Sequence, residues 1–291
     1  MSNPRIPYVM PEHQPRLAPL DGKRLLVQIV VNVEHWPLDR PMPRSILPAP
    51  YGQEAIPDVP NFSWVEYGMR QGLSRFLRVL GERGLTAGAA INADCINQYP
   101  TASAAMLEAG WEFVGHGVHQ RAMNVVEDPA GVVKESLAML EAFTGQRTRG
   151  WLGPGLRESS DTPEYLVDGG VEYVLDWCID DIPVWMHTAR GPLLALPYSL
   201  ELNDSVIHAV EDHPSSTLLQ RVTDTVATFE REMDDTCRLL TIPLHPHLMG
   251  VAHRIGYLER TLDMLLARDD VRFASGSELV DWFTAQVPAP V

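Results

Sequence analysis

Short apolar runs alternate along the chain with longer amphipathic segments. The run from Arg24 to Val33 is apolar almost throughout, as expected for a strand that is buried on both faces. From Val65 to Arg83, apolar residues instead recur at helical spacing and stop at Gly84, which predicts a helix. The same alternation continues to the C-terminus. We expect strands at 24–33, 86–91, 112–115, 150–152, 171–175, 193–196, 239–243 and 271–274, and helices at 65–83, 101–109, 132–143, from Thr162 onward, at 216–234, at 255–267 and after the capping-box sequence 275–278.

The spacing of these elements predicts the type of sheet. Strands separated by helices imply right-handed crossovers and a parallel sheet. Because seven or eight such units occur and no Gly-x-Gly-x-x-Gly motif follows the first strand, we predict an α/β fold of the distorted (β/α)7–8 barrel type. Residues 23–288 form this barrel, and the proline-rich residues 1–22 form an arm laid over its surface. The proline-rich stretch 34–63 is expected to be a functional loop, and the acidic stretch before 193–196 to be irregular.

Composition and charge narrow the classes of function. With 291 residues, the chain is long enough to bury a large core in one domain. Its net charge of −15 argues against nucleic acid or an anionic membrane as partner, because both require a basic face. We see neither a secretory signal nor an apolar run long enough to span a membrane. The three cysteines share no close spacing, and we expect a cytoplasmic protein with reduced thiols.

Polar residues follow almost every expected strand, where barrels collect their active-site groups. They are Glu34 and His35 after the first strand, His116 and His119 after the third, Trp151 and Gly155 at the fourth, Asp176, Asp180 and Asp181 after the fifth, Glu201, Asn203 and Asp204 after the sixth, and His245 and His247 after the seventh. Such regular placement indicates one convergent polar pocket rather than scattered surface polarity.

Amide-type hydrolysis is chemistry that these residues can perform. It requires a base that activates water, donors that hold the oxyanion and an acid that protonates the leaving nitrogen. Glu34 is the candidate base, and His245 the candidate acid because neighbouring carboxylates favour a protonated imidazole. A salt bridge from Glu34 to Arg149 or Arg157 is the structural alternative. For the pair Asp180–Asp181, loop hydrogen bonding is as good an interpretation as catalysis.

Seven segments, in this order, resemble the polysaccharide-deacetylase (NodB-homology) superfamily, and within it the bacterial purine-catabolic allantoinases. They are Asn32–His35, Trp64–Arg70, Gly115–Gly117, Gly150–Trp151, Asp180–Trp185, Pro197–Asp204 and Leu244–His245. The similarity covers roughly residues 24–285. It implies a distorted NodB-type barrel and hydrolysis of a carbon–nitrogen bond at a carbonyl.

The resemblance also implies a metal site, from which this sequence departs. In metal-dependent members, the first acid after strand one is the base, the second is a metal ligand, and two histidines four residues apart complete the site. By position, Glu34 falls on the base, His35 on the ligand and His116 on the first histidine, but residue 120 is Gln. Either His35, His116 and His119 hold a zinc-like ion, or no metal is held. We favour the second alternative.

The resulting hypothesis is a cytoplasmic hydrolase acting on a carbon–nitrogen bond of a small, cyclic amide, imide or ureide. Its catalytic residues are Glu34, His116, Asp181 and His245, and its substrate-binding residues are Trp151, Gly155, Asp180, Trp185, Tyr198, Asn203, Asp204 and His247. The apolar segment Leu152–Leu156 argues against allantoin itself, whose ureido side chain needs polar partners. Two rivals remain: an N-deacetylase of a sugar or glycan, and an inactive barrel that binds a metabolite. We expect a small-molecule substrate, neither nucleic acid nor membrane as partner, and a homo-oligomer.

Overall fold

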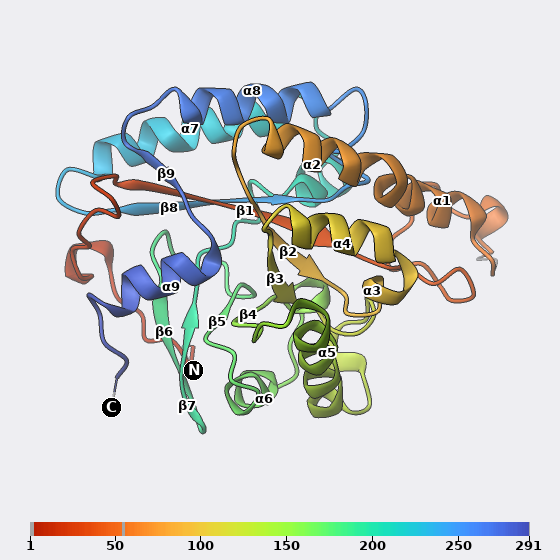
Figure 1. The fold of residues 1–291 in the computed structure, drawn as a ribbon, viewed down its shortest axis with the longest axis horizontal. Coiled ribbons are helices and arrows are strands. Elements are labelled where there is room, and N and C mark those ends of the chain that lie inside the picture. Colours follow the sequence, from red (N-terminus) through yellow and green to blue (C-terminus); the bar gives the residue numbers. More distant parts are fainter. Residues whose placement is uncertain (1–2, 54–55, 291) are drawn as a thin grey trace.

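A curled sheet of nine strands runs through the part of the chain that the structure, a computed structural model, describes: residues 3–53 and 56–290 (Figure 1). The strands are β1 (Leu25–Val33), β2 (Gly88–Ile91), β3 (Glu112–Gly115), β4 (Gly150–Trp151), β5 (Tyr173–Val174), β6 (Val184–Thr188), β7 (Gly191–Ala195), β8 (Arg238–Leu244) and β9 (Val271–Phe273). The helices are α1 (Val59–Tyr67), α2 (Leu73–Gly81), α3 (Cys95–Gln98), α4 (Pro100–Glu108), α5 (Pro129–Thr144), α6 (Thr162–Asp168), α7 (Thr217–Glu232), α8 (Ile255–Leu266) and α9 (Gly276–Thr284).

The sheet has the order β6-β7-β5-β4-β3-β2-β1-β8, and β9 pairs with the start of β1 on the edge opposite β8, the same edge that pairs with β2 farther along. Every pair is parallel except β6 with β7. The two edge strands, β6 and β8, do not pair with each other in the described part of the chain, so the sheet is a half-barrel with an open seam. The predicted α/β barrel class is confirmed, in this incompletely closed form.

The alternation of side chains along β1 divides the core into two layers. Its odd-numbered residues pack in an outer cluster against α2, α7 and α8, which cover that face in Figure 1. Leu26 and Val30 instead join an inner cluster, to which α9 contributes Leu279. Because successive side chains point to opposite faces, Asn32 and, just beyond the strand, Glu34 continue on the inner side.

The same parity operates on the strands that surround β1. In each case, a residue of the inner cluster and a later polar residue are separated by an even number of positions, so both side chains point to the same face. These pairs are Ala90 and Asn92 at the end of β2, Val114 and His116 at the end of β3, Leu196 and Tyr198 after β7, and Leu239 and His245 at the start and just beyond the end of β8. The strand ends therefore direct their polar side chains toward one place inside the half-barrel.

The N-terminal arm crosses the open seam. Arg5 O accepts a hydrogen bond from His187 N on β6 (2.9 Å). On the other side of the seam, Leu17 is 1% exposed, and its N–H donates to Thr236 Oγ1 ahead of β8 (3.1 Å). The arm thus connects the two edge strands, β6 and β8, which do not pair with each other in the sheet formed by the described residues.

Two expected elements differ from the structure, and a third agrees with it. The helix expected at 65–83 starts earlier, at Val59 within the expected loop, and is interrupted by a π-helical turn at Gly68–Gly72. The acidic segment that we expected to be irregular contains β6, an edge strand in which only Met186 is buried, so it lacks a continuous apolar run. The capping box of the last helix is confirmed, with Ser275 Oγ accepting from Glu278 N (3.2 Å) and Glu278 Oε2 accepting from Ser275 N (2.8 Å).

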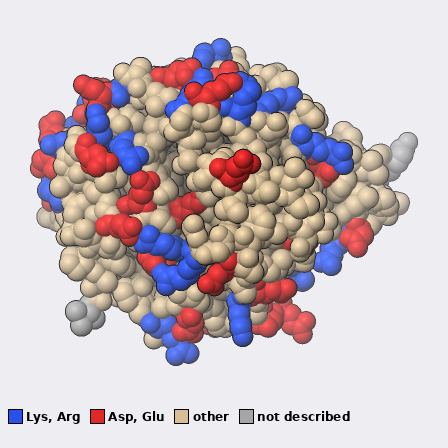
Figure 2. Space-filling view, viewed as in Figure 1, with Lys and Arg blue, Asp and Glu red and all other residues tan. Residues whose placement is uncertain are grey.

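On the face shown in Figure 2, acidic and basic side chains alternate, without a continuous basic patch. The net charge of the chain is −15. Among the helices formed by the described residues, none combines the length and apolar character that a membrane span requires.

The π-helical turn brings helix backbone against the loop that follows β8, which only glycine permits. A Cβ on Gly72 would lie 1.9 Å from Pro246 O, and a Cβ on Gly68 would lie 2.4 Å from His247 N. We therefore expect Gly72→Ala to destabilise the protein by about 1–3 kcal/mol through overpacking. The matched control is Gly81→Ala in α2, where a Cβ meets nothing within 4 Å and should stabilise the helix by about 0.5–1 kcal/mol. Urea unfolding of both variants checks this; equal midpoints would contradict the close contact.

Candidate active site

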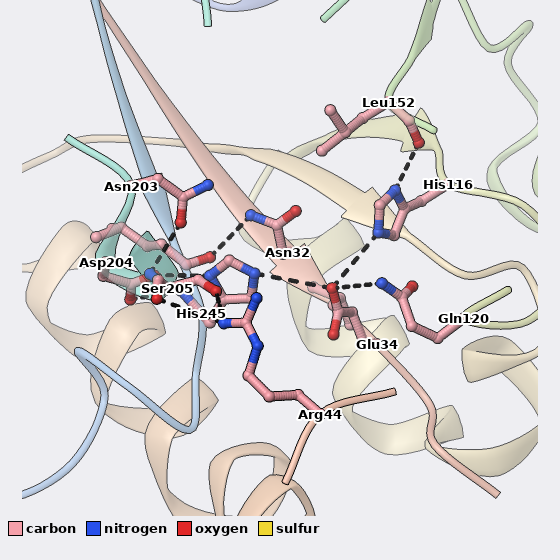
Figure 3. A network of polar contacts seen from close by, with 12 residues as sticks. Asn32, Glu34, Arg44, His116, Gln120, Leu152, Asn203, Asp204, Ser205 and His245 are labelled. Carbon is pink, nitrogen blue, oxygen red and sulfur yellow. Dashed lines mark hydrogen bonds and ion pairs between the residues drawn. The ribbon is translucent and has the colours of Figure 1, made fainter. Parts of the chain in front are cut away.

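Glu34 lies at the centre of a polar network at the C-terminal ends of the strands (Figure 3). It is 6% exposed. Its Oε2 accepts a hydrogen bond from Trp36 Nε1 (2.8 Å), and its Oε1 accepts one from Gln120 Nε2 (2.8 Å). The Nε2 atoms of His116 and His245 stand 3.6 and 3.7 Å from Oε1. The ends of β1, β3 and β8 thus bring Glu34 together with both histidines.

The surroundings keep Glu34 ionised. Burial by itself raises the pKa of Glu34, but the close approach of the His116 imidazole and the charge of His245 outweigh it and lower the pKa from 4.5 to about 2. Because the folded pKa lies below the unfolded one, the ionised group stabilises the fold at pH values above 4.5. That contribution is lost as the pH falls toward 2.

Asp204 holds His245 in position. Its Oδ1 lies 2.6 Å from His245 Nδ1, and its Oδ2 accepts from the backbone N–H groups of His245 (2.7 Å) and Met249 (3.2 Å). Burial lowers the pKa of His245, but the Asp204 carboxylate beside Nδ1 and Glu34 beyond Nε2 more than offset it, so the pKa is raised above 6.5. The raised pKa favours the protonated imidazole, in which Nε2–H faces Glu34.

On the side of Glu34 away from His245, His116 and the side-chain amides of Asn92 and Gln120 support the carboxylate. His116 Nδ1 donates to Leu152 O (2.5 Å), which directs Nε2 toward the carboxylate. Asn92 Nδ2 donates to Gln120 Oε1 (3.0 Å) and to His116 O (2.5 Å). Since Gln120 in turn donates to Glu34, the Asn92 side chain ties the histidine, the glutamine and the carboxylate into one network.

A second set of polar side chains lies beyond His245. The Tyr198 hydroxyl accepts from Asn32 Nδ2 (3.2 Å) and from Asn203 Nδ2 (3.5 Å). Asn203 Oδ1 accepts from Ser205 N (2.9 Å), and Arg44, from the loop between β1 and α1, donates to the Ser205 hydroxyl. The long loop therefore contributes Arg44 and Trp36 to the site, in line with its expected functional role.

His247 differs in character from His245. Its ring makes edge-on contacts with Trp64 (centroids 4.6 Å apart) and Trp36 (5.8 Å). Burial, together with the nearby charge of His245, lowers the pKa of His247 to about 3. At neutral pH, His247 is thus an uncharged part of an aromatic wall.

Several expected binding residues lie elsewhere. Asp180, Asp181 and Trp185 line a cavity of about 970 Å³ at the seam, and Glu34, His116 and His245 lie outside its wall. Tyr198 also lines this cavity, while its hydroxyl belongs to the network with Asn32 and Asn203. Asp180 Oδ2 accepts from Gln14 of the N-terminal arm (2.6 Å). Asp181 therefore does not join the Glu34 cluster as a catalytic carboxylate. The β6–β7 hairpin, absent from our expected elements, carries this segment away to the seam.

Trp151 and Gly155 are also displaced from the expected pocket. On β4, the alternation that directs Leu152 inward directs Trp151 outward, where it is fully buried and packs against Gly115. Gly155 is exposed in a turn at a positive φ of 66°. The alternative salt bridge from Glu34 to Arg149 is wrong, because Arg149 pairs with Glu172 and Asp281.

The metal set implied by the resemblance does not fit these side chains. Gln120 occupies the second histidine position and donates to Glu34. His116 is held by Leu152 with Nε2 directed at the same carboxylate. His35 and His119 instead approach Asp94, at 3.7 and 3.8 Å from its Oδ2. The predicted ligand set of His35, His116 and His119 is therefore not assembled.

We did not predict from the sequence that Asn92, Trp36 and Arg44 belong to the site. Gln120 was noted only because it replaces the second histidine of the related metal-dependent enzymes. Asn92 could have been found from strand parity, since it follows Ala90 of the inner cluster by two residues. Trp36 and Arg44 lie in a loop without periodicity, so no sequence signal places them.

Comparisons with known proteins agree with this geometry at the level of the fold. Neither a protein-family model nor the sequence of a curated protein matches the chain. A probable polysaccharide deacetylase from Pseudomonas aeruginosa PAO1 is 24% identical, with 92% of this chain and 93% of that chain covered and a TM-score of 0.81. A PuuE allantoinase is 22% identical, with 99% and 96% covered and a TM-score of 0.82. The chain has the polysaccharide-deacetylase fold. A CE4 family pseudoenzyme from Bacillus anthracis is more distant, at 14% identity, 95% and 73% coverage and a TM-score of 0.53.

Replacing Asp204 tests the electrostatics of the site. In Asp204→Asn, burial still disfavours the charged imidazole while the adjacent carboxylate is gone, so the pKa of His245 should fall below 6.5. The raised pKa contributes stability below 6.5 that is lost as pH rises through the folded value. The variant should therefore lose more stability at about pH 5 than at about pH 9. NMR titration of the His245 ring, assigned with His245→Ala, together with urea unfolding at both pH values, measures this. An unchanged titration would contradict the role of Asp204.

Proposed function

We propose that the protein is a hydrolase that cleaves a carbon–nitrogen bond at the carbonyl of a small amide. The observation that carries the proposal is the pairing of Glu34 with His245. Their facing atoms are 3.7 Å apart, and their pKa values are shifted in opposite directions. Two titratable groups whose environments separate their pKa values are the signature of a base and an acid.

In this reaction, Glu34 takes a proton from water as the water oxygen attacks the carbonyl carbon. His245 Nε2 gives its proton to the leaving nitrogen as the C–N bond breaks, which yields a carboxylic acid and an amine or a ring-opened equivalent. The distances of 3.6 and 3.7 Å from Glu34 Oε1 to the two imidazoles exceed a direct hydrogen bond. A reacting group that lies beside these atoms can therefore contact the base and an imidazole without displacing either.

The two proton transfers assist each other. The charge of His245 is one reason why the pKa of Glu34 is low. Once Glu34 has taken its proton, the carboxylate charge that helps to raise the pKa of His245 is gone, and the imidazole releases its proton more readily. Asp204 and Gln120 are positioning residues in this scheme, since they hold the acid and the base.

Substitution of the pair tests the mechanism. Glu34→Gln keeps an acceptor for Trp36 but cannot take a proton, and His245→Ala removes the acid. Each should lower kcat by about 10²–10⁴-fold, with a smaller effect on KM. The matched control is Glu201→Gln, an exposed residue on the wall of the seam cavity, which should keep wild-type rates. Steady-state kinetics decides: wild-type turnover in His245→Ala removes its role as acid.

For the substrate, we propose a cyclic amide, imide or ureide. Glu34, His116 and His245 are 6%, 1% and 8% exposed, and Trp36 closes over the base, which favours a small, flat molecule over a long glycan. The likeness to a probable polysaccharide deacetylase supports N-deacetylation of a sugar as the second candidate.

A substrate panel separates these functions. We expect ring opening of cyclic imides, hydantoins or related ureides, seen as loss of ring absorbance and appearance of a carboxylate by NMR. Acetate release from chitooligosaccharides would favour the deacetylase. If the protein binds panel members but does not turn them over, and if the Glu34→Gln variant binds them equally well, an inactive binding barrel is favoured.

A further inference from the structure

Three metal-ligating side chains meet at the rim of the half-barrel beside the Glu34 network. His35 follows β1, Asp94 follows β2 and His119 follows β3, and these strands are neighbours in the sheet. One ligand atom from each lies within 4.8 Å of the other two. We propose that His35, Asp94 and His119 form a binding site for a divalent transition metal of the zinc class.

The spacing of the three groups fits an ion better than it fits direct bonding. His35 Nδ1 and His119 Nδ1 lie 3.7 and 3.8 Å from Asp94 Oδ2, which is too long for a hydrogen bond. Ligands around a tetrahedral zinc are about 3.3–3.4 Å apart, from metal–ligand distances of about 2.0–2.1 Å. Each histidine needs to close on Asp94 by only a few tenths of an ångström, and the ligand atoms of the two histidines already lie within 4.8 Å of each other. Two imidazoles and one carboxylate are also a donor set that zinc accepts.

The surroundings hold the ligands ready. His35 Nδ1 is buried and has no hydrogen-bond partner within residues 3–53 and 56–290. Asn97 Nδ2 and Gln98 Nε2 donate to Asp94 Oδ1 and Oδ2 (both 3.0 Å), which orients the carboxylate from behind, as outer-shell groups do at metal sites.

The backbone fixes the relative positions of the three ligands. Asp94 N donates to Val118 O (3.1 Å), which ties the end of β2 to the residue before His119. His35 N donates to Asn92 Oδ1 (3.1 Å), two residues before Asp94. A site whose ligand residues are anchored through their own backbone N–H groups needs little reorganisation to bind an ion.

The site differs from the one that the resemblance implies. It uses Asp94 and His119 in place of His116 and residue 120, both of which contact Glu34. The His119 side chain is 43% exposed, so a fourth coordination position faces solvent and can take water or a ligand oxygen. The site does not depend on the proposed hydrolase activity, since an inactive protein with these residues also binds the ion.

Calorimetric titration of the chelator-stripped, full-length protein with Zn²⁺, and with Co²⁺ as a spectroscopic probe, tests the proposal. We expect one ion per chain and a four-coordinate Co²⁺ spectrum. Asp94→Asn and His119→Ala should weaken binding at least about 100-fold, beyond the roughly 10- to 100-fold effect of losing an outer-shell partner. The matched control is His187→Ala, an exposed histidine on β6, which should bind as the wild type does.

His116→Ala separates this site from the alternative set of His35, His116 and His119. Our proposal expects wild-type affinity in this variant, with thermal melting as the check that it is folded. Loss of binding in folded His116→Ala, with affinity retained in Asp94→Asn, would overturn the assignment. A dissociation constant above about 1 mM for the unmodified protein would overturn it as well. So would wild-type affinity in both Asp94→Asn and His119→Ala.

Discussion

A carboxylate buried inside a sheet must be compensated, and the compensation of Glu34 organises this end of the molecule. An ionised group taken out of water is costly unless hydrogen bonds and opposite charges replace its hydration. Here the indole of Trp36, the amide of Gln120 and two imidazoles supply that replacement. Each of them is held by a further group, so the requirement of one side chain extends through β1, β3, β8 and the loop after β1.

Within this network, two histidine side chains have different roles: one can carry a proton at neutral pH, and the other is a neutral packing residue. His245 and His247 are two residues apart, but Asp204 faces the first and tryptophan rings surround the second. The pKa of His245 is consequently raised and that of His247 lowered. Environment rather than residue type therefore decides which imidazole can donate a proton at neutral pH.

Much of the fold follows from periodicity in the sequence, because buried parallel strands are apolar throughout and amphipathic helices repeat at 3.6 residues. The meeting of Glu34, His116 and His245 also follows, since strand ends in such folds share one rim. What escaped prediction involves tertiary contacts: the π-helical turn at Gly68–Gly72 lies against the backbone at Pro246, which is far away in the sequence. Likewise, Trp151 was assigned to the wrong face, because a two-residue strand gives no periodicity from which to read its direction.

The open seam has a consequence for how the molecule can vary. A closed barrel has a circumference set by the number of strands and their stagger, and changing it requires a new ladder of hydrogen bonds. Between β6 and β8, the gap is instead crossed by the N-terminal arm and by single contacts such as Leu239 N to Asp181 O (2.9 Å). The width of the half-barrel can therefore change through substitutions in the N-terminal arm. Such a change leaves the register of the paired strands that carry Glu34 and His245 unaltered.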